Sequence, residues 1–127
     1  MAWGATIKVP ALDPVILGIL LEALTACNRH LMRQYRVPPL YASGVRYQAE
    51  PPGQENWLTA PVILVEADAK DDCEGLACWR AAELQLAGED AKAVGMSQPL
   101  VGGGTAWHIQ VQRPSGIEDP SVILGMR

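Results

Sequence analysis

Three residues that are far apart in the sequence, Cys73, His108 and Asp119, are of the types that together carry out acyl transfer. Cys73 falls at the start of a predicted helix, where free backbone N–H groups and the positive end of the helix dipole favour a thiolate. The same N–H groups suit the oxyanion that forms when a thiolate attacks a carbonyl. His108 lies on a predicted strand, and an antiparallel return would bring Asp119 beside the imidazole. The order predicts a nucleophile, a base and an orienting acid.

Each of these residues also has an ordinary structural explanation. A single cysteine in a helix is usually a small buried apolar residue. A single histidine on a strand is usually a structural or surface group, and Asp-Pro is typical of a turn. The three residue types in this order and context favour the catalytic interpretation.

A long helix is predicted over residues 13–36, after an N-terminal arm formed by residues 1–12. Asp13 suits the cap position and Pro14 the first helical position. We place Asn28 on another face than the apolar residues that recur every three or four positions, which are Ile16, Leu17, Leu20, Leu21, Leu24, Cys27, Leu31 and Tyr35. The run Val15–Leu21 is apolar all round, so we expect it to contact a protein partner or a second copy. Seven residues do not span a bilayer, and no membrane span is expected.

The elements that must position the three residues follow from the rest of the chain. A second helix should run from Asp71 or Asp72 to about Ala87, and its inward face should hold Cys73, Leu76, Ala77, Ala81 and Leu84. Residues 92–101 and 107–112 favour strands, and residues 114–116 favour a turn. Residues 61–65 indicate a buried strand or an inward-packed loop, and residues 5–9 indicate an edge strand. These elements predict an α+β domain over residues 1–127, with both helices packed on a small antiparallel sheet.

The composition narrows the classes of function. Of 127 residues, 49% are apolar and 19% are charged, which is typical of a folded domain rather than a disordered chain. The net charge of −4 argues against binding to nucleic acid. Three cysteines do not form a disulfide framework, so we expect a reducing compartment, and the first residues do not fit a signal peptide.

Three segments together resemble a known family. Asp72-Cys73-Glu74-Gly75-Leu76-Ala77, Trp107-His108-Ile109-Gln110-Val111 and Glu118-Asp119-Pro120-Ser121 are similar to the core of transglutaminase-like cysteine proteins, which belong to the papain-like superfamily. The likeness covers residues 57–125. It implies a papain-like core with Cys73 as nucleophile, His108 as base and Asp119 as orienting acid, acting without a cofactor. The ending also resembles small stand-alone members encoded by tailed bacteriophages, which implies the host cytoplasm or the virion as the location.

The chain departs from the family pattern near the nucleophile. Asp71 stands where Gly is usual, and Gly75 stands where a second acid is usual. Asp71 and Asp72 add negative charge that opposes a thiolate. Gly75 costs up to about 1 kcal/mol relative to Ala in a helix, and we expect it either to carry this cost or to open room for a substrate.

Several other residues are candidates for supporting roles at the catalytic site. Trp57 is the first candidate for a side-chain donor to the oxyanion, followed by Gln54 and Asn56; alternatively, Trp57 anchors its loop to the core. Residues 102–104 form either a mobile flap or a hairpin turn. No metal site is expected, because the chain has only two histidines and because Cys73 and Cys78 point about 140° apart on a helix. Cys27 and Cys78 are expected in the core, and His30 near the end of the first helix.

Three functions remain open from the sequence. The first is a thiol hydrolase or acyl transferase that acts on a peptide, amide or isopeptide bond of a peptide or protein substrate. The second is a catalytically weak or inactive structural component of a phage particle or of its assembly machinery, built on the same fold. The third is a binding module in which the cysteine and histidine are incidental.

Overall fold

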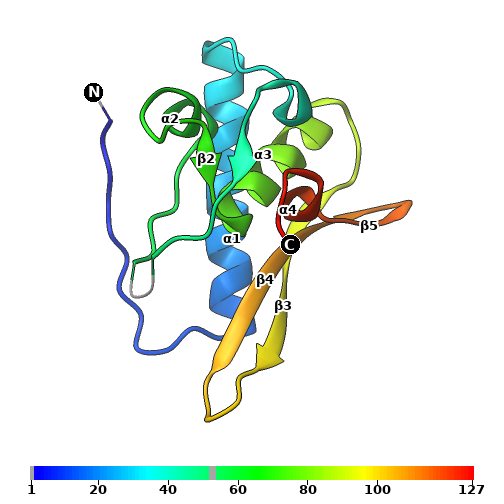
Figure 1. The fold of residues 1–127 in the computed structure, drawn as a ribbon. Helices are drawn as coiled ribbons and strands as arrows, with labels where there is room; N and C mark the ends of the chain where they lie inside the picture. The colour runs from blue at the N-terminus through cyan, green and yellow to red at the C-terminus, as the bar shows by residue number, and fades with distance from the viewer. Residues whose placement is uncertain (1, 52–53) are drawn as a thin grey trace.

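Helix α3, Cys73–Leu86, is the central element of the fold (Figure 1). The computed structural model describes residues 2–51 and 54–127; Met1 of the predicted arm, and Pro52 and Gly53, lie outside this description. Asp72 caps α3, and Gly88 follows its end with φ +88°, as the sequence predicts. All five residues expected on its inward face are buried, and so are Glu74, Gly75, Cys78, Trp79 and Ala82. Both α+β character and the position of this helix are therefore confirmed.

Helix α1, Pro14–Gln34, packs against α3 and the first strand of the main sheet. The side chain of Asp13 accepts a hydrogen bond from the backbone N–H of Ile16 at 2.8 Å, so the predicted cap is confirmed. The predicted inward face is wrong in part, because Cys27 and Tyr35 are exposed whereas Asn28 is buried. Asn28 is turned inward because its Oδ1 accepts the backbone N–H of Ala60 at 2.9 Å.

The apolar character of α1 extends beyond the seven residues considered in the sequence. By length and composition alone, α1 could cross a membrane, since an 18-residue window has a mean hydropathy of 1.4. Core helices of soluble proteins meet the same criteria of length and hydropathy, and 28% of this window is buried inside the structure. Leu17, Leu21 and Leu24 of α1 are buried against α3 and the sheet.

Residues 60–65 form helix α2, Ala60–Val65, which corrects the expectation of a strand or loop. Pro61 lies in the first turn, where its fixed φ suits a helix and its missing N–H costs nothing. The Ala60 N–H is satisfied by Asn28, a residue of another helix that local sequence does not reveal. Ile63 of α2 is fully buried beside Trp79 of α3.

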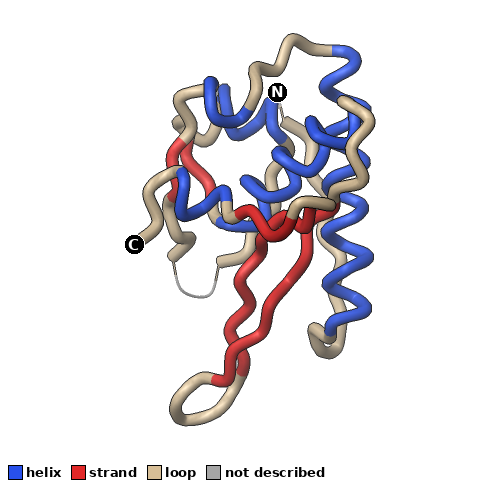
Figure 2. Tube along the Cα trace, turned by 90° about the vertical axis from the view of Figure 1, so that its right-hand side faces the viewer, coloured by secondary structure: helices blue, strands red, loops and turns tan. Residues whose placement is uncertain are grey.

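The main sheet is antiparallel, with strand order β3-β4-β5. Its strands are β3, Lys92–Pro99; β4, Thr105–Arg113; and β5, Gly116–Glu118. His108 of β4 is opposite Met96 of β3. The far end of the β3–β4 hairpin extends beyond the helices (Figure 2), and Gly102, Gly103 and Gly104 at its tip all have positive φ. These three glycines therefore form the hairpin turn, which was one of the two expectations for them.

Short elements complete the fold. The 3-10 helix η1, Leu40–Ala42, precedes β1, Arg46–Tyr47, which pairs in parallel with β2, Lys70–Asp71. The short helix α4, Pro120–Ile123, follows β5. The predicted edge strand at residues 5–9 is wrong, because the described residues of the arm, 2–12, form no strand and are exposed. In Figure 1 the arm runs down one side of the molecule, away from the edges of the main sheet, so it has no strand to pair with.

Candidate functional site

Cys73 occupies the first position of α3, where the sequence places it. Its side chain is buried, at 9% exposure. Its backbone N–H donates a hydrogen bond to Oδ1 of the cap residue Asp72 at 2.7 Å. This N–H was expected to face an oxyanion, but in the present structure the Asp72 carboxylate already occupies it.

The start of α3 meets an open edge of β4. Strand β5 pairs with β4 over Val111–Arg113, whereas Ile109 is paired with Gly95 of β3 on its other edge. Ile109 packs in the same core cluster as Cys73, and its backbone acts to lower the pKa of the thiol. Cys73 is therefore next to the strand residue that directly follows His108.

His108 and Asp119 form a hydrogen-bonded pair. His108 Nε2 and Asp119 Oδ2 are 2.7 Å apart, and Gln110 Nε2 donates to the same oxygen at 3.2 Å. Although burial opposes it, the hydrogen bonds from His108 and Gln110 hold the pKa of Asp119 below its ordinary value. Since a carboxylate only accepts, Nε2 carries the proton and Nδ1 remains as the acceptor. Asp119 thus orients the imidazole in the tautomer that a general base requires.

The thiol of Cys73 contacts Glu74 rather than His108. The Cys73 sulfur donates to Glu74 Oε2 at 3.6 Å, and the hydrogen bonds of residues 2–51 and 54–127 include none between Cys73 and His108. Burial, followed by the charge of Glu74, raises the pKa of Cys73 well above its ordinary value, against the opposing effect of Ile109. The expectation that the helix terminus favours a thiolate is therefore wrong for this state, because desolvation and nearby carboxylates outweigh the helix dipole.

Two buried acids lie close to Cys73 in the sequence and in the fold. Asp71 is 6% exposed and Glu74 is 4% exposed. Burial, with smaller contributions from neighbouring carboxylates, raises the pKa of Asp71 to about 7 and that of Glu74 to about 9. At neutral pH, Glu74 is therefore mostly protonated and neutral.

Gly75 makes room for Asp71, not for a substrate. A Cβ atom on Gly75 would lie 1.6 Å from Asp71 Oδ2 and 3.3 Å from the Cδ1 atom of Ile63. Asp71 and Gly75 therefore fit each other, since the Asp71 carboxylate fills the space that a side chain at position 75 would need.

Among the described residues, none of the three candidate oxyanion donors forms a hydrogen bond with Cys73. Trp57 packs against the core cluster that contains Cys73, and its indole Nε1 donates to Glu55 Oε2 at 3.3 Å. This supports the alternative that Trp57 anchors its loop. Gln54 and Asn56 are exposed, and no hydrogen bond among the described residues uses their side-chain amides.

The remaining cysteines and histidine are outside this site. Cys78 is buried as predicted, and its sulfur donates to the Leu21 carbonyl at 3.4 Å. Cys27 is exposed, which corrects its placement in the core, because α1 turns Thr25 and Asn28 inward instead. His30 is exposed near the end of α1.

The sequence did not reveal a group of acids beside Cys73. Glu50, Glu55 and Glu74 each offer an oxygen, and these three atoms lie within 4.8 Å of one another. Asp72, Cys73 and Glu74 form a second such group. The only signal in the sequence was the position of Glu74 next to the cysteine, because Glu50 and Glu55 come from a distant loop.

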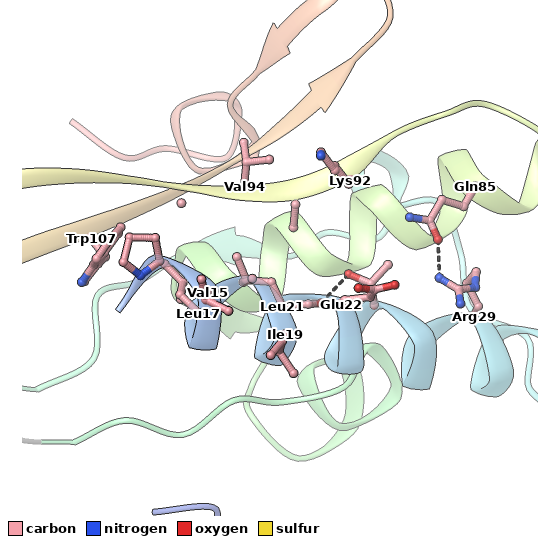
Figure 3. A pocket seen from close by; sticks show the side chains of 15 residues that line it. Val15, Leu17, Ile19, Leu21, Glu22, Arg29, Gln85, Lys92, Val94 and Trp107 are labelled. Carbon is pink, nitrogen blue, oxygen red and sulfur yellow. Dashed lines mark hydrogen bonds between the residues drawn. The ribbon is translucent and has the colours of Figure 1, made fainter. Parts of the chain in front are cut away.

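A separate groove lies between α1 and β3 (Figure 3). It encloses about 690 Å³, and its walls include Val15 and Ile19 of α1, Val94 of β3 and Trp107 of β4. Cys73, His108 and Asp119 are not among the residues that line it. The groove therefore does not lead to the thiol.

No protein-family model, no curated protein and no solved structure matches this chain. The functional argument therefore rests on the chain's own residues and their geometry.

Proposed function

We propose that the protein is a papain-like thiol hydrolase or acyl transferase, with Cys73 as nucleophile, His108 as base and Asp119 as orienting acid. The observation that carries this proposal is the 2.7 Å pair of His108 Nε2 and Asp119 Oδ2, on a strand whose next residue contacts the Cys73 sulfur. Cys73 is the first residue of α3, and this helix packs against the antiparallel sheet that carries His108. This arrangement supports a papain-like core.

In the proposed reaction, the thiol turns from Glu74 toward His108, and Nδ1 takes the proton from the Cys73 sulfur. The thiolate attacks the carbonyl carbon of an amide, and a carbon–sulfur bond forms as the carbonyl oxygen becomes an oxyanion. The oxyanion then collapses, the carbon–nitrogen bond breaks, and His108 gives its proton to the leaving amine. Water, or a second amine, releases the acyl group from the thioester.

The raised pKa of Cys73 defines the resting state. The sulfur is held as a neutral thiol, so the nucleophile forms only while its proton moves to His108. Asp119 stabilises the imidazolium that results, because its carboxylate accepts a hydrogen bond from the Nε2–H group. The substrate class is a peptide-like amide or isopeptide, which supplies both a carbonyl and an amine leaving group.

Acylation by an activated ester tests this proposal. The full chain is incubated with p-nitrophenyl acetate, release of p-nitrophenolate is followed, and the acetylated peptide is identified by mass spectrometry. We expect one acetyl group on Cys73, and we expect it to be lost in Cys73→Ala. The rate of Cys73 acetylation should be unchanged in Cys27→Ser, since Cys27 lies on the exposed side of α1 and takes part in none of the site's hydrogen bonds among the described residues. Acetylation of Cys27 alone would reject Cys73 as the nucleophile.

A second candidate function is a structural component that assembles through α1. Val15 is 71% exposed and Ile19 is 61% exposed, and both line the groove beside β3. A second copy of the chain is the proposed partner. Sedimentation velocity over a range of concentrations should then show a dimer that Ile19→Glu disrupts; a monomer at all concentrations would reject this role.

A further inference from the structure

Three carboxylates from two separate segments meet beside the start of α3. Glu50 and Glu55 belong to the loop before α2, and Glu74 belongs to the first turn of α3. One oxygen from each lies within 4.8 Å of the others, a spacing that a single ion can bridge. Like charges repel at this distance unless a proton or a cation separates them.

The buried oxygens in this group lack partners. Glu74 is 4% exposed, and its Oε1 is fully buried with no hydrogen-bond partner among the described residues. Glu50 Oε1 is buried without a partner in the same part of the described chain. Buried polar atoms in native proteins are nearly always paired, so these two oxygens call for a bound group.

A third unpartnered oxygen lies next to the group. Asp71 is 6% exposed, and its buried Oδ2, over Gly75, also has no hydrogen-bond partner within residues 2–51 and 54–127. Asp71 is not one of the three clustered acids, so its oxygen is a further buried acceptor without a partner beside the group.

The other oxygens of the loop carboxylates are already fixed. Glu50 Oε2 accepts the backbone N–H of Asn56 at 2.8 Å, and Glu55 Oε2 accepts the indole N–H of Trp57 at 3.3 Å. Such outer contacts orient carboxylates for a metal, as second-layer hydrogen bonds do in known sites. Trp57, a candidate oxyanion donor in the sequence, instead positions Glu55.

We propose that Glu50, Glu55 and Glu74 bind a hard divalent cation of the Ca²⁺ or Mg²⁺ class beside Cys73. Carboxylate oxygens are the ligands that these ions prefer. Since all three residues are glutamates, the spacing of His and Cys in the sequence does not indicate this site. The group Asp72, Cys73 and Glu74 contains a sulfur atom as a possible ligand and would favour a softer ion such as Zn²⁺.

Thermal unfolding and calorimetric titration of the full chain, after removal of metals with a chelator, test the site. CaCl2 and MgCl2 are the probes, with ZnCl2 as the comparison. We expect Ca²⁺ or Mg²⁺ to raise the melting temperature of the wild type in a saturable way. Glu74→Gln and Glu55→Gln should each weaken binding at least tenfold, whereas Glu66→Gln, which alters an exposed acid outside the group, should bind as the wild type does.

The variant Cys73→Ser distinguishes the two possible ligand groups, because only one of them contains Cys73. It also distinguishes cation binding from catalysis. It should lose acylation but keep its response to Ca²⁺ or Mg²⁺, so the proposed function and the cation site can fail independently. Absence of any response in the wild type would overturn the proposal. Stabilisation of the wild type by Zn²⁺ alone, lost in Cys73→Ser, would also overturn it. Binding of Ca²⁺ or Mg²⁺ by Glu55→Gln as tightly as by the wild type would overturn it as well.

Discussion

At the scale of single residues, Gly75 lacks a side chain because the Asp71 carboxylate occupies the space. We therefore expect Gly75→Ala to lower the free energy of unfolding by about 1–3 kcal/mol, despite the better helix propensity of Ala. The cost should be smaller in an Asp71→Ala background, where the clash is removed. Urea unfolding of the two single variants and the double variant measures this coupling, and equal costs in both backgrounds would refute the compensation.

Glu74 should make stability depend on alkaline pH. Its pKa in the folded protein, about 9, is above its ordinary value of 4.5, because burial favours the protonated form. Its contribution to stability is therefore complete below about pH 4.5 and is lost as the pH rises through 9.

We predict that the free energy of unfolding of the wild type, measured with urea in the presence of a chelator, falls between pH 7 and pH 9. One group contributes at most about 1.4 kcal/mol per pH unit. Glu74→Gln should flatten this fall, and Glu66→Gln should not. An equally steep fall in Glu74→Gln would show that another group is responsible.

At the scale of elements, Glu118 ties β5 to α3 and thereby places Asp119. Glu118 Oε2 accepts from Arg80 Nε at 2.7 Å and from the hydroxyl of Tyr41 at 2.5 Å, and Oε1 accepts from Arg113 Nη1 at 2.8 Å. Although burial opposes it, these hydrogen bonds lower the pKa of Glu118 to about 2. The next residue in the chain is Asp119, so the same contacts also restrict the position of Asp119, which pairs with His108.

Glu118→Gln should lower the free energy of unfolding at neutral pH by roughly 1–2 kcal/mol, because it weakens charge-assisted hydrogen bonds. The difference from the wild type should shrink as the pH falls from about 4.5 to about 2, since the carboxylate then becomes protonated. Asp68→Asn is the control, because the Asp68–Lys70 pair is exposed. No change in Glu118→Gln relative to this control would mean that Glu118 does not stabilise the fold.

The elements that local signals define could be predicted from the sequence. The caps Asp13 and Asp72 and the apolar periodicity placed α1 and α3 to within a few residues. The sequence did not predict helix α2, because its first backbone N–H is paired by Asn28, which lies 32 positions earlier. Burial of Asn28 and exposure of Cys27 have the same origin, since tertiary contacts decide which side of a helix faces the core.

At the scale of the whole molecule, the order of Cys73, His108 and Asp119 predicted the pairing of imidazole with carboxylate, because a hairpin return brings positions 108 and 119 together. The acids around Cys73 could not be predicted in the same way. Glu50 and Glu55 reach α3 only when their loop folds over it, and this long-range contact leaves no periodic signal in the sequence. The raised pKa of the thiol is therefore a property of the assembled fold.

The central claim is that Cys73, His108 and Asp119 act as one catalytic unit. The most direct test is the rate of Cys73 acetylation by p-nitrophenyl acetate in the wild type, His108→Ala, Asp119→Ala and the double variant. We predict that His108→Ala lowers this rate by about 10²-fold or more and that Asp119→Ala has no further effect in the His108→Ala background. Equal rates in the wild type and His108→Ala, or independent and additive losses, would contradict the claim.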